Sequence, residues 1–199
     1  MLAVFQIIVL LFSAIAHEYM HGWMAYRLGD TTAKDAGRLT LNPLAHLEWF
    51  GSFFLPLVMI FANLPFVFGW AKPVPYNPYN LRDRKYGDAK VALAGPLANL
   101  IIAVFFGLIL RFLPMFNLTF AGLLGVIVYI NLVLMVFNLV PIPPLDGSKI
   151  LATFLPADTR QRYLGSERIG FILIILFVML AGDLLMPIVN FFFRIITGS

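Results

Sequence analysis

Long apolar runs constrain the fold of this chain more than any other feature of its sequence. A helix needs about 20 apolar residues to cross the hydrocarbon core of a bilayer, and the runs that reach this length are 2–26, 89–112, 120–140 and 169–196. Across the chain, 61% of the residues are hydrophobic and only 12% are charged, which exceeds the apolar share of soluble domains. We therefore predict an all-α polytopic membrane protein with about four spanning helices in a single membrane-embedded domain, 1–199.

A fifth apolar stretch, 51–68, differs from these runs because polar and helix-breaking residues interrupt it. Pro56, Asn63 and Pro65 lie inside it, and a proline removes a backbone donor and disrupts a helix interior. Such a segment is either a broken spanning helix or a re-entrant hairpin that returns to the face where it started.

The distribution of basic residues favours the re-entrant alternative. Most of the Lys and Arg lie in the connections 27–50, 70–90 and 149–168, whereas 113–119 carries none. The positive-inside rule places basic connections in the cytoplasm, and all three share that side only if 51–68 does not cross. The small net charge of +4 is then explained by membrane orientation, and nucleic acid is not an expected partner.

A short alternating stretch, Arg38-Leu39-Thr40-Leu41, follows the first run. Alternation with a period of two is typical of a strand, so we expect a short β-hairpin-like connection at this point. The edge of such a strand could hold an extended peptide by strand addition. A plain connecting hairpin is the alternative.

An H-E-x-x-H motif near the end of the first run carries the chemistry. His17 and His21 are four residues apart, so they lie on one face of a helix and can converge on one metal ion. Glu18 lies close enough to take a proton from a metal-bound water. An ionisable side chain at membrane depth costs free energy, so it is expected to have a functional role. The alternative interpretation is a surface helix with two solvated histidines. The expected cofactor is zinc, at one ion per chain.

A catalytic zinc usually takes three protein ligands and a water, so a third ligand is needed. The chain has no cysteine, which excludes thiolate ligands and disulfides. Asp146 is the favoured ligand, because Pro141, Pro143 and Pro144 stop the preceding helix and should present it on an unwound backbone. The alternative is a turn aspartate, since Asp-Gly is a common turn pair.

The other candidates have simpler explanations. His46 is the second choice as ligand, although a lone loop histidine is more often a hydrogen-bonded structural residue. Asp183 lies in the last run, where it could pair with an arginine or cap a helix restarting at Leu184. Glu48 stays as a further candidate. The acidic residues of polar connections are expected to be solvated: Asp30, Asp35, Asp83, Asp88, Asp158 and Glu167.

Two motifs together resemble the site-2 protease family of intramembrane zinc metalloproteases (peptidase M50). The first is the H-E-x-x-H set at 17–21, and the second is F-N-x-x-P-x-x-P-x-D-G from Phe137 to Gly147. The stretch Gly95-Pro96-x-x-Asn99 is similar to a segment between these motifs in many members. The chain resembles a minimal form of the family, without PDZ or CBS modules.

The resemblance implies that His17, His21 and Asp146 bind zinc and that Glu18 is the catalytic base. It also implies that Asn138 points into the site, where its amide could hold the substrate carbonyl or the developing oxyanion. From the residues alone, Asn138 could equally form an interhelical hydrogen bond.

The expected function is an intramembrane zinc endopeptidase that cuts peptide bonds in or near transmembrane segments, as in regulated intramembrane proteolysis. The expected partners are a transmembrane protein or peptide substrate and the lipid bilayer, and the expected location is a prokaryotic cell membrane with the active site towards the cytoplasm. A membrane metal transporter or metal-sensing protein that uses the same His and Asp cluster is the alternative. A catalytically silent scaffold is a third explanation. Glu18 favours the protease over the transporter, because the sequence shows one His and Asp cluster and Glu18 supplies a base beside it.

Overall fold

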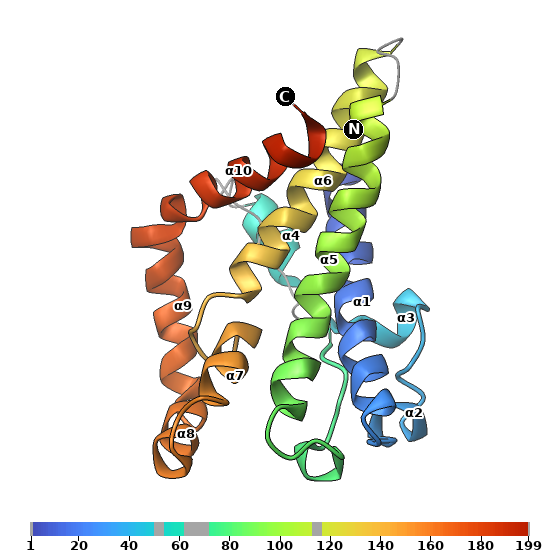
Figure 1. Cartoon of the computed structure of the whole chain (residues 1–199). Coiled ribbons are helices and arrows are strands. Elements are labelled where there is room, and N and C mark those ends of the chain that lie inside the picture. The colour runs from blue at the N-terminus through green and yellow to red at the C-terminus, as the bar shows by residue number, and fades with distance from the viewer. Residues whose placement is uncertain (1, 50–53, 62–71, 113–116, 199) are drawn as a thin grey trace.

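The computed structural model describes residues 2–49, 54–61, 72–112 and 117–198 of the chain. Within these ranges every helix or strand assigned is a helix (Figure 1), which confirms the predicted all-α class. In chain order the elements are α1 (Leu2–Arg27), α2 (Thr32–Asp35), α3 (Pro43–His46), α4 (Leu55–Phe61), η2 (Pro78–Asn80), α5 (Gly87–Phe112), α6 (Leu118–Asn138), α7 (Asp146–Ala152), α8 (Ala157–Leu164), α9 (Glu167–Ala181), η3 (Gly182–Leu184) and α10 (Met186–Thr197).

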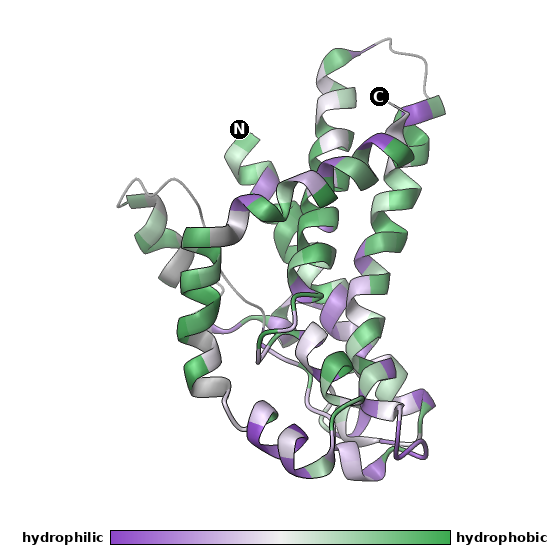
Figure 2. Ribbon diagram, turned by 60° about the vertical axis from the view of Figure 1, so that its left-hand side comes forward, coloured by the Kyte–Doolittle hydropathy of each residue, from purple (hydrophilic) through white to green (hydrophobic). Residues whose placement is uncertain are grey.

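Three of the described helices, α1, α5 and α6, are long and apolar enough to cross a membrane. The predicted last span, 169–196, is a helix pair in which Ile172–Leu180 and Gly182–Thr197 meet at 68°. The break lies between Leu180 and Gly182, and Pro187 follows in the first turn of α10, where its missing N–H is tolerated. Figure 2 shows hydrophobic residues along the long helices and hydrophilic residues gathered at one end of the bundle. The chain is therefore an integral membrane protein. Its described residues include three helices that could span, or four if the bent pair counts as one.

The central helix of the bundle is α5, which contacts α1, α6, α7 and α10. Small side chains let neighbouring helices approach closely in a membrane, where no hydrophobic force drives helices together. Those buried along α5 are Gly87, Ala92, Ala94, Gly95, Ala98, Ala103 and Gly107.

At the end of the bundle opposite α7, α10 lies across α5 and α6 (Figure 1). Val189 and Ile196 of α10 are buried there in one cluster with Ala103, Val128 and Leu132. This cluster forms the apolar core at that end of the bundle.

The two flanks of the segment 51–68 meet at one end of the bundle. The backbone N–H of Arg82 donates to the carbonyl of Leu28 at 2.8 Å, and that of Lys72 donates to the carbonyl of His46 at 2.8 Å. These bonds hold the two flanks together, as the re-entrant alternative requires. The path of the segment lies outside the described residues except near α4, whose 7 residues are too few to span. The re-entrant path itself stays a prediction.

Asp30 links the same two flanks and is fully buried, so the prediction that it is solvated is wrong. Its carboxylate accepts hydrogen bonds from the Asn77 N–H at 2.7 Å, the Asn80 amide at 2.9 Å and the Thr32 hydroxyl at 2.6 Å. Burial on its own raises the pKa of a carboxyl, but these hydrogen bonds outweigh burial and hold the pKa of Asp30 below its usual value.

Asp88, in the first turn of α5, is also buried and not solvated as expected. It pairs with the guanidinium of Arg160 on α8 at 3.0 Å and accepts a hydrogen bond from the Tyr76 hydroxyl at 2.7 Å. A buried carboxylate needs such a partner, and here the partner lies 72 residues later in the chain.

The predicted strand at Arg38–Leu41 is wrong, because these residues have irregular backbone and no strand occurs among the described residues. Side chains, and not a neighbouring strand, bind the nearby backbone. The Arg38 guanidinium donates to the Lys72 carbonyl at 2.8 Å, and His46 Nε2 donates to the Thr40 carbonyl at 2.6 Å. Four alternating residues are too few to outweigh these bonds.

Candidate metal centre

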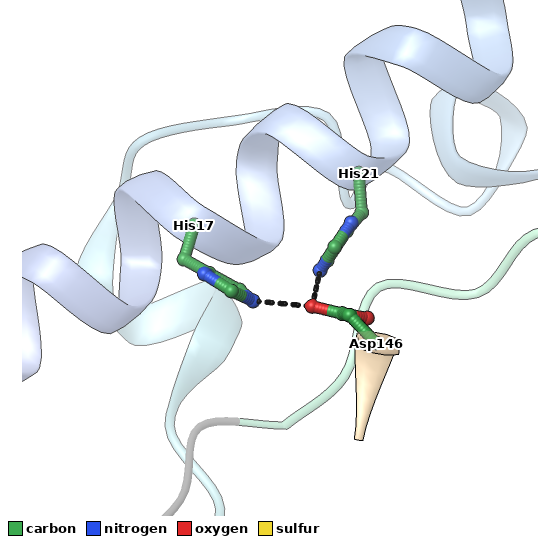
Figure 3. Close-up of side chains that lie close together, drawn as sticks. All are labelled: His17, His21 and Asp146. Atoms are coloured by element: carbon green, nitrogen blue, oxygen red, sulfur yellow. Dashed lines mark hydrogen bonds and ion pairs between the residues drawn. The ribbon is translucent and has the colours of Figure 1, made fainter. Parts of the chain in front are cut away.

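Three buried side chains converge between α1 and the start of α7 (Figure 3). His17 and His21 lie one turn apart on α1, and Asp146 is the first residue of α7. The Nε2 atoms of His17 and His21 lie 3.0 Å and 3.1 Å from Oδ2 of Asp146. In the part of the chain that the structure describes, this is the one group of His and acidic residues placed to share a metal ion.

The backbone between α6 and α7 brings Asp146 to α1. The helix α6 ends at Asn138, and the prolines that follow keep the chain out of helical conformation until Leu145, as predicted. Asp146 itself begins a new short helix, whereas an unwound position was expected. Gly147 packs against the carbonyls of Leu139 and Val140 so closely that a Cβ would collide with both. This glycine therefore allows α7 to fold back on the end of α6.

The second ring nitrogen of each histidine has an acceptor. His17 Nδ1 donates to Oδ1 of Asn99 at 2.7 Å, and His21 Nδ1 donates to the carbonyl of Val91 at 2.7 Å. Both acceptors belong to α5. A histidine that donates from Nδ1 keeps a lone pair on Nε2, which is the form that binds a metal ion.

The donor set fits zinc. Two imidazole nitrogens and one carboxylate oxygen are typical ligands, and three protein ligands leave the fourth position of a catalytic site open. Tetrahedral zinc would hold such ligand atoms roughly 3.3 to 3.5 Å apart. The ligand atoms of His17, His21 and Asp146 all lie within 4.8 Å of one another, so small shifts are enough to accommodate the ion.

Gly95 lets the backbone of α5 pass directly against the rings of the two histidines. A Cβ built on Gly95 would lie 2.5 Å from His17 Nε2 and 2.6 Å from His21 Cε1, closer than real Cβ atoms approach other groups. The backbone at this position therefore forms one wall of the group, and a larger residue would push the imidazoles out of place.

Glu18 lies next to His17 but outside the three-residue group. Its Oε2 accepts a hydrogen bond from the backbone N–H of Val74 at 2.9 Å. Val74 is itself buried against α1, since a Cβ on Gly22 would lie only 2.7 Å from its Cγ1. The stretch after the segment 51–68 thus holds the Glu18 carboxylate beside the centre.

The other sequence candidates lie apart from this group. His46 is fully buried and donates to Thr40, in line with a structural histidine. Asp183 is exposed in η3, between α9 and α10. Glu48 is not among the grouped ligands either. Asn138 donates to the carbonyl of Leu134 at 2.9 Å within its own helix, so its catalytic role stays a prediction.

Sequence reasoning assigned no role to Asn99, Asn131 or Ser13, which are buried around His17. Asn99 was visible as part of Gly95-Pro96-x-x-Asn99. The sequence does indicate that these amides form hydrogen bonds within the protein, because polar groups inside apolar spans need partners. The sequence does not indicate which partners, since they come from different spans.

Comparison with known proteins establishes the family. The model of peptidase family M50 matches residues 113–182, a range that contains Asp146. The chain is also 37% identical to YwhC of Bacillus subtilis (strain 168), named as a zinc metalloprotease, over 94% of this chain and 86% of YwhC. The chain belongs to peptidase family M50.

Two further relatives carry the same description. MJ0611 of Methanocaldococcus jannaschii is 35% identical over 74% of this chain and 72% of its own length. Rip2 of Mycolicibacterium smegmatis is 30% identical over 85% of this chain and 64% of its own length. No solved structure matches the chain significantly. As a member of M50 the chain is a zinc metalloprotease, which confirms the resemblance seen in its sequence.

Proposed function

We propose that this chain is an intramembrane endopeptidase that hydrolyses peptide bonds in or near the transmembrane segments of other proteins. One observation carries the proposal: His17 and His21 lie on a helix apolar enough to span, and Asp146 joins them from α7. Burying such polar groups within a spanning bundle is costly, and a function that needs them there offsets the cost.

In this proposal His17 and His21, through Nε2, and Asp146, through its carboxylate, hold zinc. A bound zinc ion supplies Lewis acidity, which lowers the pKa of a water molecule to about 7. Glu18 accepts the proton of the attacking water on its carboxylate and passes it to the leaving amine. The Val74 N–H, 2.9 Å from Glu18 Oε2, restricts the orientation of this carboxylate.

Asn138 is proposed to stabilise the oxyanion. Asn138 is the last residue of α6, a few residues before Asp146, and its side-chain amide donates to the carbonyl of Leu134. The amide nitrogen carries two hydrogens, so one can donate to Leu134 while the other donates to the substrate oxygen. A helical substrate must also unwind first, because its carbonyls are occupied by its own hydrogen bonds.

Reconstitution in liposomes tests the proposal. The purified chain is mixed with single-span peptides that vary in sequence, and mass spectrometry locates the cleaved bonds. We expect cuts within or beside the apolar segment, stopped by a zinc chelator and restored by added zinc. Zinc uptake into the vesicles without any cleavage would favour the metal-transporter alternative instead.

We also propose that the end of the bundle carrying α2 and α8 faces the cytoplasm of a prokaryotic cell. Basic residues gather at that end, including Lys34 on α2 and Arg162 on α8. The start of α6, which Asn117 caps, lies at the opposite end of the bundle (Figure 1).

A cysteine-labelling experiment tests this orientation, because the chain has no cysteine of its own. We expect Asn117→Cys to react with a membrane-impermeant thiol reagent in intact cells. Lys34→Cys and Arg162→Cys should react only after the membrane is opened. Labelling of Lys34→Cys in intact cells would reverse the assigned orientation.

A further inference from the structure

Behind His17, a chain of buried polar groups connects the three spanning helices. Asn99 of α5 and Asn131 of α6 are fully buried, and Ser13 of α1 is 4% exposed. The Asn99 side chain joins His17 to Asn131, which in turn joins Asn99 to Ser13. This series of polar groups is connected to the metal centre through the hydrogen bond between Asn99 and His17.

The backbone carbonyl at the far end of this series determines which atom donates and which accepts in each hydrogen bond. The carbonyl of Ile127, 2.9 Å from one terminal atom of the Asn131 amide, can only accept, so that atom must be Nδ2. Asn131 therefore presents Oδ1 to Asn99, at 3.0 Å. The facing Asn99 atom must then be Nδ2, and it is also 3.3 Å from the carbonyl of Ser13. This leaves Asn99 Oδ1 for His17, whose Nδ1 must carry the hydrogen.

We propose that Asn99 is a positioning residue that selects the Nδ1–H tautomer of His17, and that Asn131 orients Asn99 for this task. With the hydrogen on Nδ1, the lone pair of His17 Nε2 points at the shared ligand position. Had the Asn99 amide the opposite orientation, it would present N–H groups to Nδ1 and favour a hydrogen on Nε2. That tautomer cannot bind a metal ion through Nε2.

His21 provides an internal reference, because its Nδ1 donates to a backbone carbonyl, that of Val91. A backbone carbonyl has no alternative orientation and needs no helper. The tautomer of His21 is thus assured by α5 alone, whereas that of His17 depends on two side chains from two helices. The inference rests on the proposed ligand set, since it assumes that His17 Nε2 binds zinc.

Zinc affinity of the full-length chain in detergent, measured by competition with a chromophoric chelator, tests the inference. Removing an outer hydrogen-bond partner of a metal-binding histidine typically costs about 10- to 100-fold in affinity. We expect a loss in this range for Asn99→Leu, which keeps the volume but has no acceptor. Asn99→Asp keeps an acceptor for Nδ1–H and should lose clearly less. If Asn99 served only packing, Asn99→Asp would be the more damaging change, because it buries a carboxylate.

Ser13→Ala is the matched control. It removes one hydroxyl from the same chain of groups but leaves the Ser13 carbonyl and the Asn99 amide in place, so zinc affinity should stay near that of the unaltered chain. Asn131→Leu should fall between this control and Asn99→Leu, since the Ser13 carbonyl still helps to orient Asn99. Equal affinities for Asn99→Leu and Asn99→Asp would overturn the inference.

Cobalt substitution reports the tautomer directly. In the Co²⁺-loaded chain, the two ring N–H protons of His17 and His21 should appear as separate, slowly exchanging paramagnetically shifted NMR signals. Asn99→Leu should speed exchange of the His17 signal alone and leave the His21 signal unchanged. Two unchanged signals would contradict the role of Asn99. Undiminished zinc binding in His17→Ala would instead contradict the ligand assignment in the proposed function.

Discussion

A Glu18→Gln variant is expected to keep its zinc but lose nearly all proteolysis. The glutamine side chain has the same shape, and its amide oxygen can still accept the hydrogen bond that the Val74 N–H donates to Glu18 at 2.9 Å. It cannot accept a proton from water, and the loss of a general base typically lowers the rate by about 100- to 10,000-fold. Cleavage of a reconstituted single-span peptide measures the rate, and elemental analysis measures the zinc.

Asn138→Ala provides a graded comparison for this result. Removing one oxyanion donor typically costs about 100- to 1,000-fold, so this variant should retain more activity than Glu18→Gln if general-base catalysis by Glu18 is the larger effect. Unchanged turnover in Asn138→Ala would limit Asn138 to its hydrogen bond with Leu134. Loss of zinc in Glu18→Gln would show that Glu18 is a ligand and not the base.

Asp146→Asn is expected to empty the metal centre. The change preserves the shape of the side chain but removes the anionic oxygen that lies 3.0 Å and 3.1 Å from the two histidine Nε2 atoms. Zinc affinity depends on deprotonated, charged ligands. The loss should therefore exceed the roughly 10- to 100-fold cost of disturbing an outer hydrogen bond. Zinc titration of the metal-free chain gives the affinity.

Asp183→Asn is the matched control, because it makes the same chemical change at an exposed residue of η3. It should bind zinc as the unaltered chain does. Full zinc occupancy in Asp146→Asn would mean that the ion is not held by the group of His17, His21 and Asp146. Circular dichroism of both variants separates loss of metal from loss of helical structure.

Much of this protein follows from local properties of its sequence. Length and apolarity alone indicate which segments are α1, α5 and α6, because a single segment satisfies its own backbone within a bilayer only as a helix. The spacing of His17 and His21 determines that they share a helix face. Asp146 is 129 residues from His17, yet the prolines before it mark the place where the chain leaves α6.

Local properties also led to errors where the pattern was short or the partner distant. The alternation at Arg38–Leu41 resembled a strand, but the Arg38 guanidinium donates to the Lys72 carbonyl and the His46 ring donates to the Thr40 carbonyl. Asp30 and Asp88 lie in polar connections and yet are buried, because hydrogen bonds or an ion pair compensate for burial. The residues around Asp30 and Asp88 in the sequence do not indicate which distant residues these partners are.

The sequence by itself therefore determined the all-α class, the segments that form α1, α5 and α6, the histidine pair and the proline-marked carboxylate. Only the tertiary structure decided that Val74 holds Glu18, that Gly95 passes behind the imidazoles and that Asn99 and Asn131 meet behind His17. The physical reason is the range of the interactions. Helix formation and apolarity act within one segment, whereas the direction of a hydrogen bond depends on groups that packing brings together from several spans.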